Sequence, residues 1–140
     1  NFLSLFENIV FIDVNDTNYD LFCDNNKKNE KRRAMSSFFI NLTNYKVIDE
    51  IYIYNLLFKL LNDIDNNKNN KDMLQVNEEI IENIFIMVTN GRELLKENIN
   101  KWEKITTDIT LFSKMKMIDN NGISRKLTFK CMDFLEELEE

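Results

Sequence analysis

The stretch that decides the fold is residues 47–62, which read VIDEIYIYNLLFKLLN. Leucine, isoleucine and aromatic side chains recur here at helical spacings, and the run from Leu56 to Leu61 has good helix propensity. Apolar side chains cover several faces of this predicted helix, so we expect it to have neighbours on several sides and to lie at the centre of the fold. The β-branched and aromatic residues 51–54 would also suit a strand, which is the alternative for that short part.

Apolar stripes with the same period recur along the rest of the chain. They predict five further helices, at residues 2–10, 29–44, 77–90, 92–115 and 123–140. Asn77 is the expected N-cap of the third of these, and Asn90-Gly91 is expected to end it, since Gly91 is free to adopt a positive φ. The side chains expected to be buried in these stripes include Met35, Phe38, Phe39, Leu42, Tyr45, Ile99, Trp102 and Ile109. The chain has no proline and only two glycines, which fits a stack of amphipathic helices.

Composition and charge bound the class of protein. A chain of 140 residues with 44% hydrophobic residues can form one domain, residues 1–140, with a core of its own. The net charge of −6 argues against tight, non-specific binding to nucleic acid. The apolar run 2–12 contains Glu7, lacks a basic flank and is too short to span a membrane. Because the chain opens on this run and not on Met, we expect it to be a piece of a longer protein.

Patterns that carry catalysis or metal binding are missing from the sequence. It has no histidine, so no Ser–His or Cys–His pair can form, and Cys23 and Cys131 alone cannot supply a zinc site. No glycine-rich phosphate loop is present. The pairs Glu78-Glu79 and Glu136-Glu137 are consecutive, so on a helix their side chains diverge by about 100°. We therefore expect no enzyme activity, no cofactor, no metal and no small-molecule substrate.

Two polar segments are predicted to be flexible loops. They are residues 24–30 and residues 62–75, and the second contains the polar run 64–72. Such a run has no apolar stripe to bury, so we expect it to be a solvated connector. Its length should then matter little to stability, because the entropy of closing a loop grows only with the logarithm of its length.

Three stretches together resemble the middle domain of eukaryotic initiation factor 4 gamma and related scaffold proteins. The first is FFINLTNYKVI at 38–48, followed by LLFKLL at 56–61. The second is IMVTNGREL at 86–94, similar to a helix of the family that ends in Gly, a basic residue and Leu. The third is SRKLTFKCMDFL at 124–135, similar to the closing helix of the family. The likeness covers about residues 30–138, which is about half of such a domain, and we expect this part to be a C-terminal fragment that holds its C-terminal repeats.

The resemblance implies a fold and a function. The fold would be all-α, a HEAT-like or armadillo-like stack of antiparallel helix hairpins that forms an α-α superhelix. The function would be that of a non-catalytic, cytoplasmic scaffold in translation initiation, which docks a DEAD-box RNA helicase and other translation factors. Thr128 stands where the family usually has Arg, so binding of RNA is expected to be weak or indirect. Three alternatives stay open: a scaffold that interacts with poly(A)-binding protein, a nucleolar scaffold of pre-ribosomal RNA processing, or a purely structural helical-repeat module.

Polar residues at predicted helix ends and connectors are the candidates for partner binding. In the family such positions carry the partner contacts, because the helix faces are used in packing. Positive charge near a helix N-terminus interacts unfavourably with the macrodipole, so the three cations at residues 31–33 are not expected to stabilise their helix. A surface that only keeps the protein in solution is the alternative for all of these residues. The candidates are Lys31, Arg32, Arg33, Asn90, Arg92, Glu93, Lys96, Glu136 and Glu137.

Overall fold

A computed structural model describes the backbone of residues 19–139 and the side chains of residues 23–139. The predicted first helix, residues 2–10, lies outside this described part. Within it the chain forms six α-helices and no strand, so the all-α prediction is confirmed and the strand alternative at 51–54 is wrong. The elements are α2 (Tyr19–Asn44), α3 (Glu50–Asn66), the 3-10 turn η1 (Lys71–Met73), α4 (Leu74–Asn90), α5 (Arg92–Leu95), α6 (Ile99–Ser113) and α7 (Arg125–Glu139).

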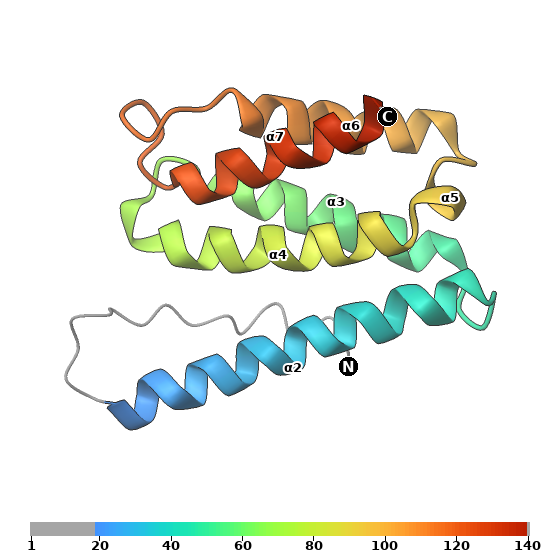
Figure 1. The fold of residues 1–140 in the computed structure, drawn as a ribbon, viewed down its shortest axis with the longest axis horizontal. Coiled ribbons are helices and arrows are strands. Elements are labelled where there is room, and N and C mark those ends of the chain that lie inside the picture. The colour runs from blue at the N-terminus through green and yellow to red at the C-terminus, as the bar shows by residue number, and fades with distance from the viewer. Residues whose placement is uncertain (1–18, 140) are drawn as a thin grey trace.

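The long helices form two layers (Figure 1). Helices α2, α4 and α7 run in one direction in the nearer layer, and α3 and α6 run in the opposite direction behind them. Helix α3 packs against α2, α4 and α6, so it has neighbours on several sides as predicted, and α4, which packs against α2, α3, α5 and α7, shares the centre of the stack with it. The helices therefore stack as antiparallel pairs. Whether the stack belongs to the HEAT-like class stays a prediction.

The core lies between the two layers. Helices α3 and α4 supply most of its fully buried side chains, because each carries apolar residues on more than one face. Phe134 of α7 joins the core and packs against the rings of Phe85 and Trp102, at centroid distances of 5.3 and 6.5 Å. Edge-to-face and tilted ring pairs of this kind stabilise beyond the area they bury.

Helix α2 is longer than the sequence pattern predicted. It begins at Tyr19, so residues 24–30 are helical and the prediction of a loop there is wrong. The segment contains no proline or glycine, and Lys28 pairs with Asp24 one turn earlier at 3.4 Å. Local propensity and such a pair support a helix even where no apolar stripe marks it.

The buried face of α2 is mostly polar. Phe38 is 58% exposed and Tyr45 is 83% exposed, so the prediction that these two members of the apolar stripe are buried is wrong. Phe39 of the stripe packs against the core. Met35, Phe39 and Leu42 of that stripe are half-buried. The side chains that α2 buries instead are Arg32, Ser36, Ile40 and Thr43.

The opposing surface of α4 explains this rotation of α2. Helix α4 buries Glu79 and Asn83 at the contact, and buried polar groups need hydrogen-bond partners. The guanidinium of Arg33 donates from Nε to Oε1 of Glu79 at 2.8 Å and from Nη2 to Oε2 at 2.6 Å. The hydroxyl of Ser36 donates to Oδ1 of Asn83 at 2.8 Å. A polar seam therefore joins the two helices, and an apolar stripe could not have satisfied it.

The polar segment 62–75 is also structured, contrary to the prediction of a flexible loop. Helix α3 continues to Asn66, and η1 and α4 begin at Lys71 and Leu74. The short loop between them docks on the turn before α7, where the backbone N–H of Gly122 donates to the carbonyl of Lys68 at 2.8 Å. A segment with polar side chains can therefore still be docked on the fold, because here its backbone forms the hydrogen bond to the turn before α7.

Asn77 joins this loop to the same turn and is not the N-cap that the sequence suggested. It lies inside α4, is fully buried, and donates from Nδ2 to the carbonyls of Gly122 at 2.9 Å and Asn67 at 3.2 Å. The amide therefore bridges two connectors that are 45 and 10 residues away in sequence.

The predicted helix 92–115 is broken into α5 and α6. The break falls at residues 96–98, where Asn98 caps α6 by accepting from the N–H of Lys101. Ile99 becomes the first residue of α6 and is 69% exposed, so the prediction that it is buried beside Trp102 and Ile109 is wrong for Ile99. Ile109 is fully buried, and Trp102 is partly buried against the core.

Gly91 is needed for close approach between helices and not for an unusual backbone angle. Helix α4 ends at Asn90 as predicted, but the φ of Gly91 is −109°, so the helix end does not use the positive φ that glycine allows. A Cβ at this position would lie 2.4 Å from Cδ1 of Ile40, so glycine lets α2 approach the end of α4.

Candidate protein-binding surfaces

Among the described residues no group of three or more His, Cys, Asp or Glu side chains could hold a metal ion. The part of the chain covered by the structure also contains no helix long and apolar enough to cross a membrane. The surface features described next lie mainly at the two ends of the helix stack.

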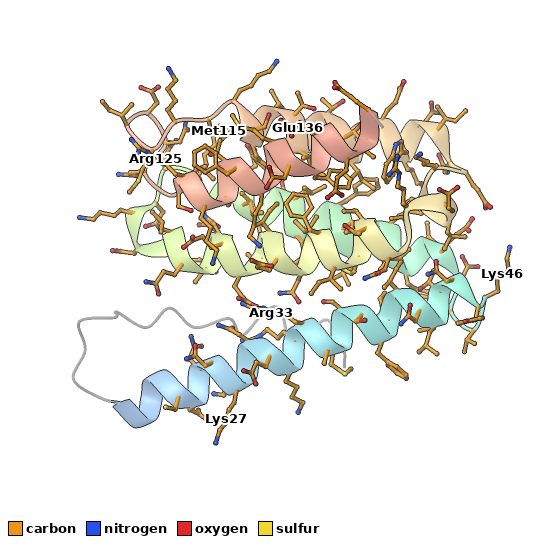
Figure 2. All side chains as sticks on the ribbon, viewed as in Figure 1. Lys27, Arg33, Lys46, Met115, Arg125 and Glu136 are labelled. Atoms are coloured by element: carbon orange, nitrogen blue, oxygen red, sulfur yellow. The ribbon has the colours of Figure 1, made fainter. Side chains whose placement is uncertain are left out.

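The basic residues of α2 lie in the middle of a helix and not at a helix start. Arg32 is only 3% exposed, donates from Nη1 to Oδ1 of Asn29 at 2.8 Å, and has its pKa lowered by burial. The hydrogen bond to Glu79 raises the pKa of the Arg33 guanidinium above its ordinary value (labelled in Figure 2). Lys31 is exposed. Two of the three predicted partner-binding cations are therefore engaged within the fold.

A second group of predicted residues gathers where the connectors meet. We call this surface the connector end and define it as residues 45–52 and 90–100, which lie on one side of the molecule, at the right in Figure 1. The amide Nδ2 of Asn44, at the end of α2, donates to the carbonyl of Asn90 at 2.9 Å and so joins the two segments. The hydroxyl of Tyr54 donates to the carbonyl of Leu95 at 2.9 Å and ties α3 to α5.

The turn from α2 to α3 has a defined backbone. Lys46 has a φ of 62°, and the N–H groups of Lys46 and Val47 donate to the carbonyls of Thr43 at 3.0 Å and Leu42 at 2.9 Å. This is the Schellman pattern, which satisfies the last carbonyls of a helix. It holds Tyr45 and Val47 on the surface in fixed positions.

The predicted polar residues at the connector end differ in environment. Glu93 is exposed, whereas Arg92 and Lys96 are half-buried. The Nε of Arg92 is buried and has no hydrogen-bond partner. Asn90 is exposed, and its side chain donates to the carbonyl of Ile86 in its own helix at 2.8 Å. The structure thus brings these four predicted residues together on one surface.

Exposed apolar side chains accompany them, which the sequence pattern did not predict. Tyr45, Val47, Tyr52 and Ile99 are all more than half exposed at this end. Beside them lies a shallow hollow of about 610 Å³ lined by Glu50, Glu97, Asn98, Ile99 and Asn100. Exposed aromatic and aliphatic side chains among charged ones are typical of surfaces that bind other proteins.

Glu136 and Glu137 lie apart from this group, in the last turns of α7. Both are exposed, and Figure 2 shows Glu136 on that helix. Among the residues with described side chains, neither forms one of the ion pairs. They add negative charge to the surface of α7.

The opposite end carries an apolar groove that the sequence reasoning missed. We call it the corner groove; it has a volume of about 670 Å³ and is lined by residues 113–118, at and after the end of α6, and by residues of α7 between 125 and 132. Figure 2 shows Met115 and Arg125 at this end, away from Lys46. The signal was present in the run Lys114-Met115-Lys116-Met117-Ile118, in which cations and apolar residues alternate where no helix is formed.

Comparisons with known proteins give no further guidance. No protein-family model matches the chain, no curated protein matches it, and no solved structure matches it.

Proposed function

We propose that the chain is a non-catalytic scaffold domain that binds a protein partner through its connector end. The observation that carries this proposal is that exposed apolar side chains, Tyr45 and Ile99 among them, gather on one end with the polar residues of 90–96. Leaving such side chains in water forgoes the free energy of burying them, which binding of a partner recovers.

The resemblance of 38–48, 86–94 and 124–135 to the middle domain of initiation factor 4 gamma supports a particular partner. That partner is a DEAD-box RNA helicase, and the process is translation initiation in the cytoplasm. The net charge of −6 and the internal engagement of Arg32 and Arg33 favour protein over RNA as the ligand.

The hydrogen bonds at the connector end suggest how a scaffold could act on an enzyme. Hydrogen bonds from Asn44 and Tyr54 and the turn at Lys46 hold the two connectors in one arrangement. A rigid surface that fits one conformation of a two-lobed helicase better than the other shifts the population toward that conformation. In this proposal the scaffold stimulates the helicase without any chemistry of its own.

The test is stimulation of the ATPase of a purified DEAD-box translation helicase. The double variant Tyr45→Asp with Ile99→Asp places charge on two exposed apolar positions, so the fold should persist while stimulation is largely lost. Arg92 is left unchanged because its buried Nε makes a loss of folding hard to separate from a loss of binding. The matched control is Leu111→Asp, an exposed apolar residue of α6 outside the connector end.

Equal melting temperatures by circular dichroism would show that all variants fold. Full stimulation by the double variant would remove the connector end from the proposal. A wild-type chain that neither binds nor stimulates the helicase would remove the helicase as its partner.

A further inference from the structure

The corner groove has the shape and lining of a recognition site for apolar side chains. Met115, Met117 and Met132 line it together with Ile118 and Phe129. Ile118 is 90% exposed and Phe129 is 57% exposed, although both are large and apolar. Methionine side chains are flexible and polarizable, so a surface rich in them adapts to inserted apolar groups.

The charge of the groove is opposite to that of the molecule. Lys114, Lys116 and Arg125 line it, and no acidic residue does. The stretch 113–132 holds five Lys or Arg residues and one Asp, whereas the whole chain has a net charge of −6. Within the part of the chain whose side chains are described, none of the three lining cations forms an ion pair. The groove thus combines an apolar floor with cations that the fold leaves available.

We propose that the corner groove binds a short, acidic, amphipathic helix of a partner protein. The apolar face of such a helix would insert side chains among the methionines and Phe129, and its carboxylates would meet Lys114, Lys116 and Arg125. Apolar anchors with charges of one sign around them are the usual features of a helix bound in a groove. The groove and the connector end lie at opposite ends of the stack, so this site is separate from the proposed helicase surface (Figure 2).

Other occupants fit the groove less well. A membrane surface offers no side chains to enter a concave groove. Nucleic acid would require more cations and more aromatic rings than three cations and one phenylalanine provide. The chain's own acidic end cannot supply the helix to a second copy, because Leu135 and Leu138, the apolar residues of that end, pack against their own core. An acidic helix from another protein matches both the apolar lining and the charge.

The test is a fluorescence anisotropy titration of the 140-residue chain against a labelled synthetic helix with Glu on one face and Leu and Phe on the other. A second peptide with Lys in place of Glu tests the charge requirement. We expect saturable binding of the acidic peptide only, weakened by added salt because part of the attraction is electrostatic.

Two variants, each with a matched control, locate the binding site. Phe129→Ala should weaken binding about tenfold, as truncation of an aromatic anchor does. Its control, Phe38→Ala, removes a phenylalanine of nearly equal exposure on α2 and should leave binding unchanged. Lys116→Glu should weaken binding several-fold, whereas Lys27→Glu, a change of another exposed lysine, should not.

Several outcomes would overturn the proposal. They are no binding of the acidic peptide, equal binding of the Lys peptide, and equal loss of affinity in Phe38→Ala. In a further outcome the acidic peptide fails to bind, while vesicles containing phosphatidylserine or single-stranded RNA bind the wild type and not Phe129→Ala. That result would assign the groove to the lipid or to the RNA. Self-association lost in the same variant would assign it to a second copy. Failure of helicase stimulation alone would leave the groove proposal standing, since the two sites use different residues.

Discussion

Arg33 is the hydrogen-bonded charge partner of a carboxylate that the fold buries. Glu79 is 6% exposed, and both of its carboxylate oxygens accept from the guanidinium of Arg33. The planar fork of arginine matches a carboxylate in a way that lysine does not. The residue therefore attaches α2 to α4.

Replacing Arg33 tests this contribution. Breaking a fully buried pair costs about 3–5 kcal/mol, but the Arg33 side chain is 43% exposed, so we expect Arg33→Ala to lower the free energy of unfolding by about 1–3 kcal/mol. Adding Glu79→Gln should recover part of the loss, because an amide does not need a cation. Lys31→Ala, a change of a neighbouring exposed cation, should change the urea midpoint little. Equal midpoints for Arg33→Ala and Lys31→Ala would show that the pair contributes nothing.

Cys131 makes stability depend on alkaline pH. Burial raises the pKa of its thiol from the ordinary value of 9.0 to about 12. Because the folded state keeps the proton, the contribution of Cys131 is complete below about pH 9 and is lost as the pH rises toward about 12.

The comparison of wild type with Cys131→Ala isolates this effect, since the raised pKa of Tyr54 acts equally in both proteins. Between about pH 8 and pH 10.5 the wild type should lose about 1–2 kcal/mol more of unfolding free energy than the variant, measured by urea denaturation. Parallel losses in the two proteins would mean that the thiol is not protected by the fold.

At the scale of elements, the loop between α3 and η1 acts as a structural connector. A Cβ added to Gly122 would lie 2.2 Å from the carbonyl oxygen of Asn67 and 2.9 Å from that of Lys68. These are backbone atoms, which cannot move aside without undocking the loop. The contact holds the turn before α7 against this loop.

Two alanine substitutions distinguish a docked loop from a loose one. Gly122→Ala should lower the free energy of unfolding by about 2–3 kcal/mol, the upper part of the range for overpacking. Gly91→Ala should cost less, because the two nearest atoms it meets belong to the side chain of Ile40, and the backbone oxygen of Met87 is farther away, at 3.0 Å. The measurement is thermal unfolding followed by circular dichroism. If Gly122→Ala has the same melting temperature as the wild type, the loop is a free connector. Several residues of 64–72 could then be deleted without loss of stability.

Helix-period apolar stripes predicted the helices better than they predicted their contacts. The pattern placed α3, α4 and α7 to within a few residues, because apolar packing decides those helices. It did not predict which face of α2 is buried. The surface of α4 that α2 contacts carries the polar pair Glu79 and Asn83, which no local pattern in α2 can indicate. It also missed the break at Asn98, where a side-chain cap starts a new helix.

The candidate surfaces show the same limit. Asn90, Arg92, Glu93 and Lys96 could be predicted to lie together, since they are close in sequence next to a helix end. That the turn at 45–49 would join them depends on how α2 and α4 align, which sequence spacing does not fix. The corner groove likewise requires that residues 113–118 fold beside α7.

At the scale of the whole molecule, the stack presents two surfaces of different character at its two ends. The connector end is mixed in polarity and is held by backbone and side-chain hydrogen bonds. The corner groove is apolar and basic. A rigid body with a surface at each end can hold two partners at a fixed separation, which is the property that a scaffold requires.

The most direct test of the central claim is hydrogen–deuterium exchange of the chain with and without a DEAD-box translation helicase. The account predicts that the helicase slows exchange in residues 45–52 and 90–100, while exchange at 113–132 stays unchanged. The slowing of exchange by the helicase should be absent in the Tyr45→Asp, Ile99→Asp double variant. Protection that falls elsewhere on the stack, or no protection at helicase concentrations that saturate a known scaffold, would contradict the claim that the connector end is the helicase-binding surface.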